Sequence, residues 1–236
     1  FVQSFDSYNS CPVSTNCGGT VCSLGGSWKN LTNGTEDNID WRTNQGGTTS
    51  SGTGPGSDFG GSGKYLYLEA SGTCEFQEAV LYSPCIDLGS SVAPELEFAY
   101  HMFGPNTVIL TVEIFDGTFW AEVFNKSGNQ GNNWMSENID LAPYIGDTII
   151  IRVIGITGGG YQSDIAIDQF SIEDQIGIPV ADFNSSTTTP CLNASLTLAD
   201  QSTKSPTSWN WSISPSSHTF VNSTTSTSQN PEVSLS

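Results

Sequence analysis

Residues 94–104 read PELEFAYHMFG, and the alternation within this stretch decides the fold. Every second position carries a large apolar side chain, namely Leu96, Phe98, Tyr100 and Met102. In an extended chain these four side chains point to one face, because successive residues of a strand alternate between the two faces of a sheet. Glu95 and Glu97 fall on the opposite face. The stretch therefore predicts a β-strand with one buried face and one solvated face.

Short β-branched and aromatic runs of this kind recur between clusters of Gly, Ser, Asn and Pro, which predicts many short strands. The other candidates are KYLYLEA (64–70), AVLYSPCIDL (79–88), TVILTVEIFD (107–116), FWAEVFN (119–125), TIIIRVIGIT (148–157) and DIAIDQFSIE (164–173). Helical spacing is nearly absent. Strands this numerous, with no crossover helices between them, predict an all-β antiparallel sandwich rather than a parallel α/β sheet.

The composition changes after Asp174. Residues 175–179 form a short linker, and Ser and Thr make up 25 of the 53 residues from 184 to 236. This second part could be a disordered stalk. Against that, PVADF, SLTLAD and SWNWSI resemble strands with buried aromatics at Phe183, Trp209 and Trp211. We therefore expect one sandwich over 1–174 and a partial, smaller sandwich over 180–236, which has too few strands to close two sheets.

The charge balance limits the partners. Six Lys and Arg face 24 Asp and Glu, a net charge of −18, and no basic cluster occurs. Nucleic acid and anionic membrane surfaces are disfavoured, because both require clustered cations. No apolar run approaches the ~20 residues of a membrane span, so membrane insertion is not expected. Acidic surfaces suit calcium binding or simple solubility.

Six cysteines occur at positions 11, 17, 22, 74, 85 and 191, without the spacing or paired histidines of a zinc module. They predict disulfides and hence an oxidising, extracytoplasmic setting, either secreted or at the cell surface. No signal peptide is visible, which fits a mature or excised part of an exported protein. Six cysteines allow 15 pairings, and the spacing alone does not select one.

Few residues could carry catalysis, so we predict that the chain is not an enzyme. The two histidines, His101 and His218, lie outside any HExxH, GxSxG or Cys-His arrangement. His101 fits a hydrogen-bonded histidine within a strand better than a catalytic base. Glycoside hydrolysis needs two acids facing each other across ~5–9.5 Å. Glu36 and Asp40 have Asn38 between them, and no other pair is better placed.

Six stretches occur in the order typical of one extracellular module. They are SFDSY (4–8), GGSWKNLTNGTEDNIDWR (25–42), TGPGSDFGGSGKYLYLEASG (53–72), ELEFAYHMFG (95–104), SGNQGNNW (127–134) and SDIAIDQFSI (163–172). Through them, residues 1–174 resemble a MAM domain, in the version found in exported proteins of Bacteroidetes. From residue 179 onward, PVADFNSSTTTPCLNASLTLADQSTKSPTSWNWSISP resembles the first half of a PKD domain, an immunoglobulin-like β-sandwich used as a spacer or adhesive module.

The MAM resemblance implies a jelly-roll-like antiparallel β-sandwich used for adhesion and recognition rather than for chemistry. It also implies a disulfide between Cys74 and Cys85. Cys11, Cys17 and Cys22 are three in one short stretch, so one of them must pair elsewhere or stay free, and the partner of Cys191 could belong to the missing half of the second domain.

The resemblance also suggests a reason for carboxylates in SDIAIDQF (163–170), which otherwise predicts a buried strand. A buried carboxylate needs a base, backbone donors or a metal ion. In the MAM pattern, acids in the first strand, after the Thr-Gly-Pro loop and at the end of the IAID strand correspond here to Asp6, Asp58 and Asp168. We expect these three to bind a structural Ca²⁺ ion, with Asp164 and Asp40 as reserves. Alternatively, Asp168 caps a loop by accepting backbone amide bonds.

With catalysis, nucleic-acid binding and membrane insertion disfavoured, we expect the function to be binding of another kind of ligand. Trp120, Tyr161 and Asn106 are the candidate ligand contacts, because carbohydrate sites combine exposed aromatic faces with amide side chains at a loop-rich rim. All three could equally serve packing. One hypothesis is a polysaccharide-binding module that is an accessory part of a larger exported protein. The other is a protein-protein adhesion or self-association module, with a cell-surface protein as partner and the second domain as spacer.

Overall fold

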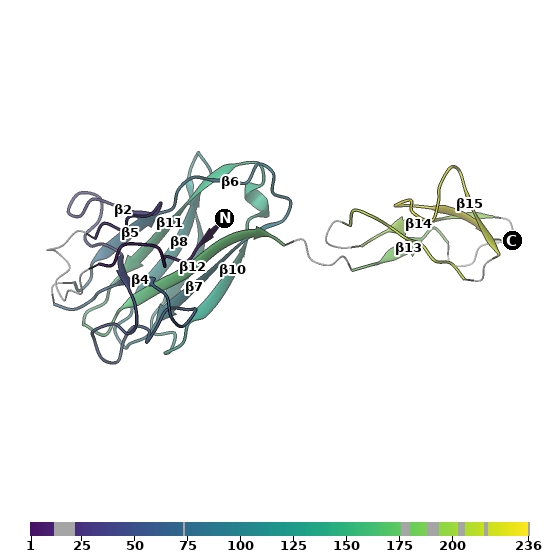
Figure 1. Cartoon of the computed structure of the whole chain (residues 1–236). Coiled ribbons are helices and arrows are strands. Elements are labelled where there is room, and N and C mark those ends of the chain that lie inside the picture. Colours follow the sequence, from purple (N-terminus) through teal and green to yellow (C-terminus); the bar gives the residue numbers. More distant parts are fainter. Residues whose placement is uncertain are drawn as a thin grey trace. The chain divides into compact units, whose positions relative to one another are not determined.

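The computed structural model describes residues 1–11, 22–72, 74–175, 180–187, 194–202, 206–214 and 217–235. The chain divides into two compact units, residues 1–175 and 176–236 (Figure 1). Apart from Gln175, the expected linker at 175–179 lies outside the described residues. Within the described ranges there is no α-helix, only one short 3₁₀-helix, η1 (Ala142–Tyr144). The prediction of an all-β fold is confirmed.

The first unit contains two six-stranded antiparallel sheets. In the first sheet the strand order is β10-β7-β12-β4-β3, and β1 also pairs with β12. Its strands are β1 (Val2–Gln3), β3 (Arg42–Asn44), β4 (Tyr65–Leu68), β7 (Pro94–Met102), β10 (Met135–Asp140) and β12 (Ile165–Asp174). In β1, Val2 is opposite Ser171, so the first and last strands of the unit are neighbours.

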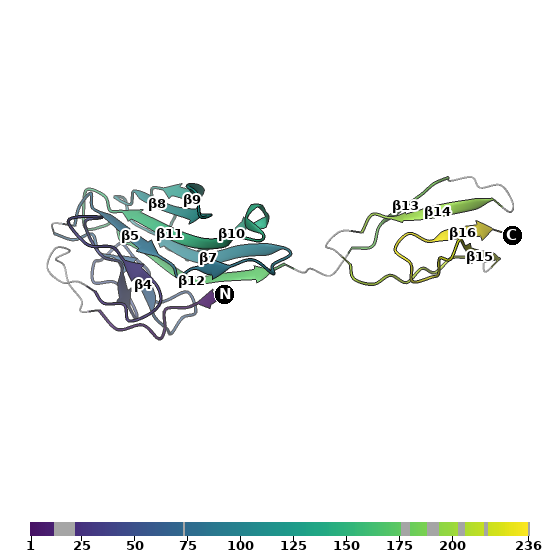
Figure 2. The same ribbon diagram turned by 90° about the horizontal axis from the view of Figure 1, so that it is seen from above.

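The second sheet has the order β2-β5-β11-β8-β9, with β6 also paired to β11. Its strands are β2 (Lys29–Asn30), β5 (Glu78–Tyr82), β6 (Ile86–Asp87), β8 (Ile109–Phe115), β9 (Trp120–Ser127) and β11 (Thr148–Ile156). Seen from above, β8, β9 and β11 lie in one layer, and β4 and β12 lie in the other (Figure 2). The unit is therefore an antiparallel β-sandwich.

The core lies between these sheets, and the apolar face predicted for PELEFAYHMFG points into it. Leu96, Phe98, Tyr100 and Met102 are all at most 2% exposed. The ring of Phe98 stacks on that of Phe170 at a centroid distance of 5.0 Å. The ring of Trp28 also packs against Phe170, at a centroid distance of 4.8 Å. Burial of these large rings is the main driving force that holds the two sheets together.

All seven strand stretches predicted for the first unit contain strands, although AVLYSPCIDL is divided into β5 and β6. In the second unit PVADF and SLTLAD overlap strands, whereas the prediction of a strand in SWNWSI (208–213) is wrong. The sequence reasoning missed β1, β2, β3 and β10. Three of these are only two or three residues long, and β10 is an edge strand whose outward side chains are polar. A strand that packs little apolar surface carries little periodicity.

The second unit contains one four-stranded sheet of order β13-β14-β16-β15. Its strands are β13 (Phe183–Ser185), β14 (Ser195–Asp200), β15 (His218–Val221) and β16 (Glu232–Leu235). Leu196, Leu198 and Val233 form its small core, and Trp211 packs against it. The prediction that Phe183 is buried is wrong, because its side chain is 53% exposed.

A disulfide joins Cys11 to Cys22, whose Cα atoms are 5.6 Å apart. The Cys74–Cys85 pairing implied by the resemblance is wrong: Cys74 is disulfide-bonded, whereas Cys85 is an exposed free cysteine in the segment between β5 and β6. Cys74 and Cys85 are near each other in the sequence, but β5 lies between them, so nearness in sequence did not make them partners. Cys17 and Cys191 lie outside the described residues.

Candidate functional site

The candidate site begins at an irregularity in β12. Ile165 and Ile167 point into the core, and so do Phe170 and Ile172, although strict alternation would turn the second pair outward. An extra residue resolves the conflict: the register against β7 shifts between Asp168 and Ser171. Such a β-bulge leaves one residue unpaired and bends the strand. Here it places Asp168 and Gln169 together on the side of β12 away from the core.

Asp168 is held by backbone amides. Its side chain is 1% exposed, Oδ2 accepts a hydrogen bond from the Phe59 amide at 3.1 Å, and Oδ1 accepts one from the Gln169 amide at 2.8 Å. Burial, together with a smaller effect of the charges of Asp58 and Asp6, raises its pKa to about 7, although the two backbone bonds act in the opposite direction. These two hydrogen bonds are the ones expected if Asp168 caps a loop, which was the alternative to calcium binding. They compensate only part of the cost of burying a charge.

Asp58 and Asp6 converge on the same place from two other segments. Asp58 is buried, and Oδ2 accepts the Gly60 amide at 3.1 Å, whereas Oδ1 is buried without a hydrogen-bond partner. The exposed Asp6 accepts the Lys64 amide at 2.7 Å. A Cβ at Gly63 would collide with the Asp6 carboxylate and lie 2.9 Å from Asp58 Oδ2. The three predicted carboxylates therefore form one cluster around Gly63 and the start of the bulge.

The three carboxylates are not arranged as a metal site in this structure. Within the part of the chain that the structure describes, no three or more His, Cys, Asp or Glu side chains are placed so that they could hold a metal ion. The unpartnered Asp58 Oδ1 and the raised pKa of Asp168 show nonetheless that negative charge at this place lacks compensation. Two carboxylates with a common neighbour repel each other unless a proton or a cation intervenes.

Asp164 and Asp40, the two reserve ligands for calcium, lie outside the cluster of Asp6, Asp58 and Asp168. Asp164 is fully buried at the start of β12, where Oδ1 accepts the Ala70 amide at 3.2 Å and Oδ2 has no partner. Burial, followed by the charge of Glu69, raises its pKa to about 7. Asp40 accepts the Cys22 amide at 2.8 Å and so positions the disulfide, and burial raises its pKa as well.

The three predicted ligand contacts do not form one site. Asn106 and Tyr161 lie on neighbouring loops, since the Asn106 amide donates to the Gln162 carbonyl at 3.2 Å, and Tyr161 is 50% exposed. Trp120 pairs with Phe115, which pairs with Ile150 at the start of β11. The loops of Asn106 and Tyr161 lie near the other end of β11, at Ile156. This end is six residues from Ile150, or about 20 Å along the strand.

Trp120 is also occupied by the protein itself. Its ring stacks on Tyr82 at 5.4 Å with an interplanar angle of 14°, and the Arg152 guanidinium lies 4.0 Å from its centroid. Arg152 in turn donates to Glu113 at 2.6 Å. Cation-π and stacking contacts use the same ring faces that a sugar would need. The packing role that the sequence left open for Trp120 is therefore the one that the geometry favours.

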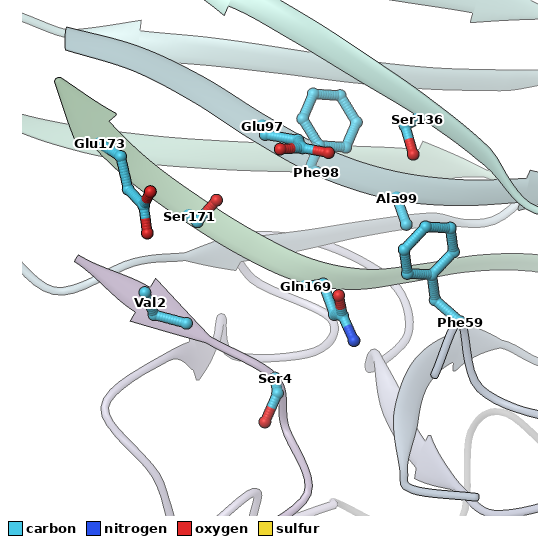
Figure 3. Close-up of a pocket in the computed structure, with 10 residues that line it drawn as sticks. All are labelled: Val2, Ser4, Phe59, Glu97, Phe98, Ala99, Ser136, Gln169, Ser171 and Glu173. Carbon is cyan, nitrogen blue, oxygen red and sulfur yellow. The ribbon is translucent and has the colours of Figure 1, made fainter. Parts of the chain in front are cut away.

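Sequence reasoning missed a groove of about 320 Å³ on the outer face of the first sheet. It extends across β1, β12, β7 and β10, and the loop that carries Phe59 closes one end (Figure 3). Polar side chains from all these segments line it, among them Ser4, Glu97, Ser136, Gln169 and Ser171. The only available signal was the polar face of PELEFAYHMFG, which we interpreted as simply solvated.

Trp134 fixes the loop at the end of this groove. Its Nε1 donates to the Ser57 carbonyl at 2.9 Å, and its ring contacts Tyr65 and Phe59 edge to face. His101, on β7, lies beneath the same ring, and its Nε2 is 3.2 Å from Asn132 Oδ1. A second, small apolar cluster of Tyr65, Tyr67 and Ala166 thus anchors the loop on the sheet.

Comparison with known proteins agrees with this architecture. The MAM domain family (meprin/A5/mu) matches residues 14–176, which is more than half of the chain. The chain belongs to the MAM domain family. The match covers nearly all of the first unit and leaves the second unit unassigned.

Relatives of this MAM domain are parts of much longer proteins. Human MAM domain-containing glycosylphosphatidylinositol anchor protein 2 is 31% identical in an alignment of 155 residues, and the match covers 58% of this chain and 16% of that protein. Neuropilin-1a of Danio rerio is 31% identical in an alignment of 143 residues, and the match covers 58% of this chain and 15% of that protein. The chain thus corresponds to about one sixth of the length of these relatives.

Solved structures similar to this chain include the K1 cleaved adhesin domain of Lys-gingipain from Porphyromonas gingivalis W83. It shares 15% sequence identity, with a TM-score of 0.49 over 74% of this chain and 97% of that one. TmCBM61 in complex with β-1,4-galactotriose shares 16%, with a TM-score of 0.42 over 62% of this chain and 88% of that one.

Outside the MAM domain, the second unit has a cavity of about 510 Å³ lined by Phe183, Trp209 and Trp211. Both indole N–H groups are already used, Trp209 donating to Asp200 at 2.9 Å and Trp211 to the Ser228 carbonyl at 2.8 Å. Buried or half-buried indoles that bond within the protein are typical of packing residues. The two indoles that line this cavity are therefore held by bonds within the unit.

Proposed function

We propose that this MAM domain is a non-catalytic recognition module that binds carbohydrate, as an accessory part of a larger exported protein. The observation that carries the proposal is a set of exposed aromatic rings on its loops, namely Phe59 (40% exposed), Phe76 (69%) and Tyr161 (50%). Exposed aromatic rings are unfavourable in water, so several in one domain indicate a surface that contacts something. Sugar rings present apolar C–H faces that match such rings.

Recognition is favoured over chemistry by the state of the titratable groups. His101 is 1% exposed, and burial lowers its pKa to about 4, so it is neutral at physiological pH and cannot exchange protons with a substrate from beneath Trp134. The buried carboxylates Asp168, Asp164 and Asp40 each accept a backbone amide, and Asp168 and Asp164 do not line the groove described above. A general acid or base must reach its substrate.

Calcium stabilisation is part of the proposal. Asp6, Asp58 and Asp168 would hold the ion, which supplies the positive charge that the cluster lacks. The fit rests on Asp58 Oδ1, a buried carboxylate oxygen with no partner. Carboxylate and carbonyl oxygens are the ligands that Ca²⁺ prefers. The ion would join the first strand, the Phe59 loop and β12, three segments that are far apart in the sequence.

The disulfide between Cys11 and Cys22 supports an extracytoplasmic location, because such bonds persist in oxidising compartments. Within the described ranges, no helix is long and apolar enough to cross a membrane. The second unit, with its single sheet and small core, fits the predicted partial immunoglobulin-like, PKD-type spacer. It would hold the MAM domain at a distance from the rest of the exported protein.

A glycan microarray with the full chain tests this function. Retention of at least one polysaccharide, with saturable binding in solution, is the expected outcome. The adhesion hypothesis predicts instead that no glycan is retained and that sedimentation shows self-association or that a cell-surface protein is captured. Turnover of a bound glycan would refute the non-catalytic assignment.

A further inference from the structure

We propose that the groove on the outer face of the first sheet is the glycan-binding site, and that its ligand is a saccharide free of acidic groups. This inference rests on the carbohydrate recognition proposed above and assigns it a place and a ligand class. Its volume of about 320 Å³ is at the lower end of the ~300–1,000 Å³ typical of small-molecule sites. A groove of this size on an open sheet suits a short segment of a longer chain.

Phe59 provides the apolar contact. Its ring is 40% exposed and is held edge to face against Trp134, with a centroid distance of 6.2 Å and an angle of 77°. Trp134 is itself fixed by its bond to the Ser57 carbonyl, so the loop on both sides of Phe59 is anchored. A pre-positioned ring loses little conformational entropy when a ligand packs on it. Figure 3 shows the ring at one end of the groove.

Gln169 and Glu97 provide the polar contacts. Both side chains are exposed, and within the described residues neither has a side-chain hydrogen bond or ion pair. Gln169 emerges from the bulge into the space between Ser4 and Phe59, and Glu97 projects from β7 (Figure 3). An amide both donates and accepts hydrogen bonds, and a carboxylate accepts strong ones from hydroxyl groups. Sugar hydroxyls satisfy both groups.

The charge around the groove excludes acidic sugars. Glu173 is directly opposite Glu95 on the neighbouring strand, and Asp140 is opposite Glu95 on its other side. Glu97 and Glu173 line the groove, and no Lys or Arg is among its lining residues. Two like charges ~4 Å apart repel by about 1 kcal/mol in water and by more near a protein surface. A uronate or sulfate group in the groove would meet only negative charge.

Asp168 acts as a positioning residue behind this site. One of its carboxylate oxygens accepts the amide of Phe59 and the other that of Gln169, which are the apolar and the polar wall residues. On the third segment, Ser4 donates to the Asp6 carboxylate at 2.9 Å. The carboxylate cluster therefore sets the separation of the groove walls without lining the groove.

The test measures binding of the full chain to a neutral galactan, chitosan and polygalacturonate by affinity electrophoresis, followed by titration with oligosaccharides of the retained polymer. Phe59→Ala and Glu97→Gln are the groove variants. Phe119→Ala is the matched control, because it removes a phenylalanine that is even more exposed than Phe59 and lies between β8 and β9 on the other sheet. All three positions are exposed, and thermal melting confirms folding.

We expect a neutral or amino polymer to be preferred, with at least a tenfold weaker affinity for Phe59→Ala and Glu97→Gln and no change for Phe119→Ala. Equal affinity of all variants, or preference for polygalacturonate, would overturn the assignment of the groove and leave glycan recognition standing. No retained polymer, here or on the microarray, would overturn both proposals. Phe59-dependent binding of a Lys-rich peptide without glycan binding would assign the groove to a protein partner instead.

Discussion

Replacing Asp168 by Asn separates the electrostatic cost of the carboxylate cluster from its proposed use in calcium binding. The substitution keeps the shape of the side chain and removes its charge. In chelator at pH 8 we expect the variant to be more stable than the natural chain. In calcium we expect that advantage to disappear.

The magnitude follows from the burial of Asp168. Its pKa is raised from 3.8 to about 7, mainly by burial, so between these values the folded state binds a proton that the unfolded state does not. Stability must therefore fall as pH rises through this window. At about 1.4 kcal/mol per pKa unit, the ionised carboxylate costs about 4 kcal/mol at pH 8. Asn loses one of the two backbone bonds, about 1 kcal/mol, which leaves a net gain of about 3 kcal/mol.

The assay is thermal unfolding of the first unit at pH 5 and pH 8, in EDTA and in calcium. For a chain of this size, about 3 kcal/mol corresponds to a rise in Tm of roughly 6–12 °C in EDTA at pH 8. At pH 5 the natural Asp168 is protonated, so the gain should vanish. Calcium at about 100 times its Kd stabilises the natural chain by about 2.7 kcal/mol, and a variant lacking one ligand gains less. Asp147→Asn, in an exposed position, is the matched control and should change nothing.

Two results would refute this reasoning. If Asp168→Asn is no more stable than the natural chain in EDTA at pH 8, the carboxylate is not an electrostatic burden. If its advantage is the same in EDTA and in calcium, no ion binds to Asp168.

Three further predictions concern single side chains. Phe170→Ala removes a ring packed between Trp28 and Phe98 and should lower the free energy of unfolding in urea by about 3–5 kcal/mol; a loss under 1 kcal/mol would contradict its place in the core. Gln169→Gly relieves a left-handed backbone (φ 49°) and should raise stability by about 1 kcal/mol while weakening glycan binding, so a loss of stability would argue against strain at the bulge. In the natural chain, native Cys85 should react with maleimide, and Cys85→Ser should abolish this labelling and leave Tm unchanged. Protection of Cys85 from maleimide in the natural chain would mean that it is paired.

The core strands could be predicted because they bury one face each. In β7 the alternation is uninterrupted, so Leu96 and Phe98 could be placed in the core from their spacing. In β10 the outward residues are polar and the strand lies at the sheet edge, where packing imposes no pattern. The bulge in β12 was legible in principle, because the three-residue interval between Ile167 and Phe170 is incompatible with both facing the core in a regular strand.

The site was only partly predictable. The convergence of Asp6, Asp58 and Asp168 came from the resemblance, because no local pattern relates residues that are more than 50 positions apart. Phe59 reaches the groove through a loop fixed by Trp134, and loop packing leaves no period in the sequence. Periodicity placed Glu97 on the outer face but could not show that this face is hollowed.

The pairing of β1 with β12 has a consequence for how the domain is made. Val2 is opposite Ser171, and the backbone nitrogen of Phe1 donates to the Ile172 carbonyl, so residues 1–3 find their partners only after almost the whole domain has been synthesised. Contacts of such high sequence separation slow folding. Until then β1 lacks its partner strand, and its unpaired backbone groups are open to pairing with other chains. During biosynthesis, the closing of the sandwich therefore has to wait for the last strand to emerge.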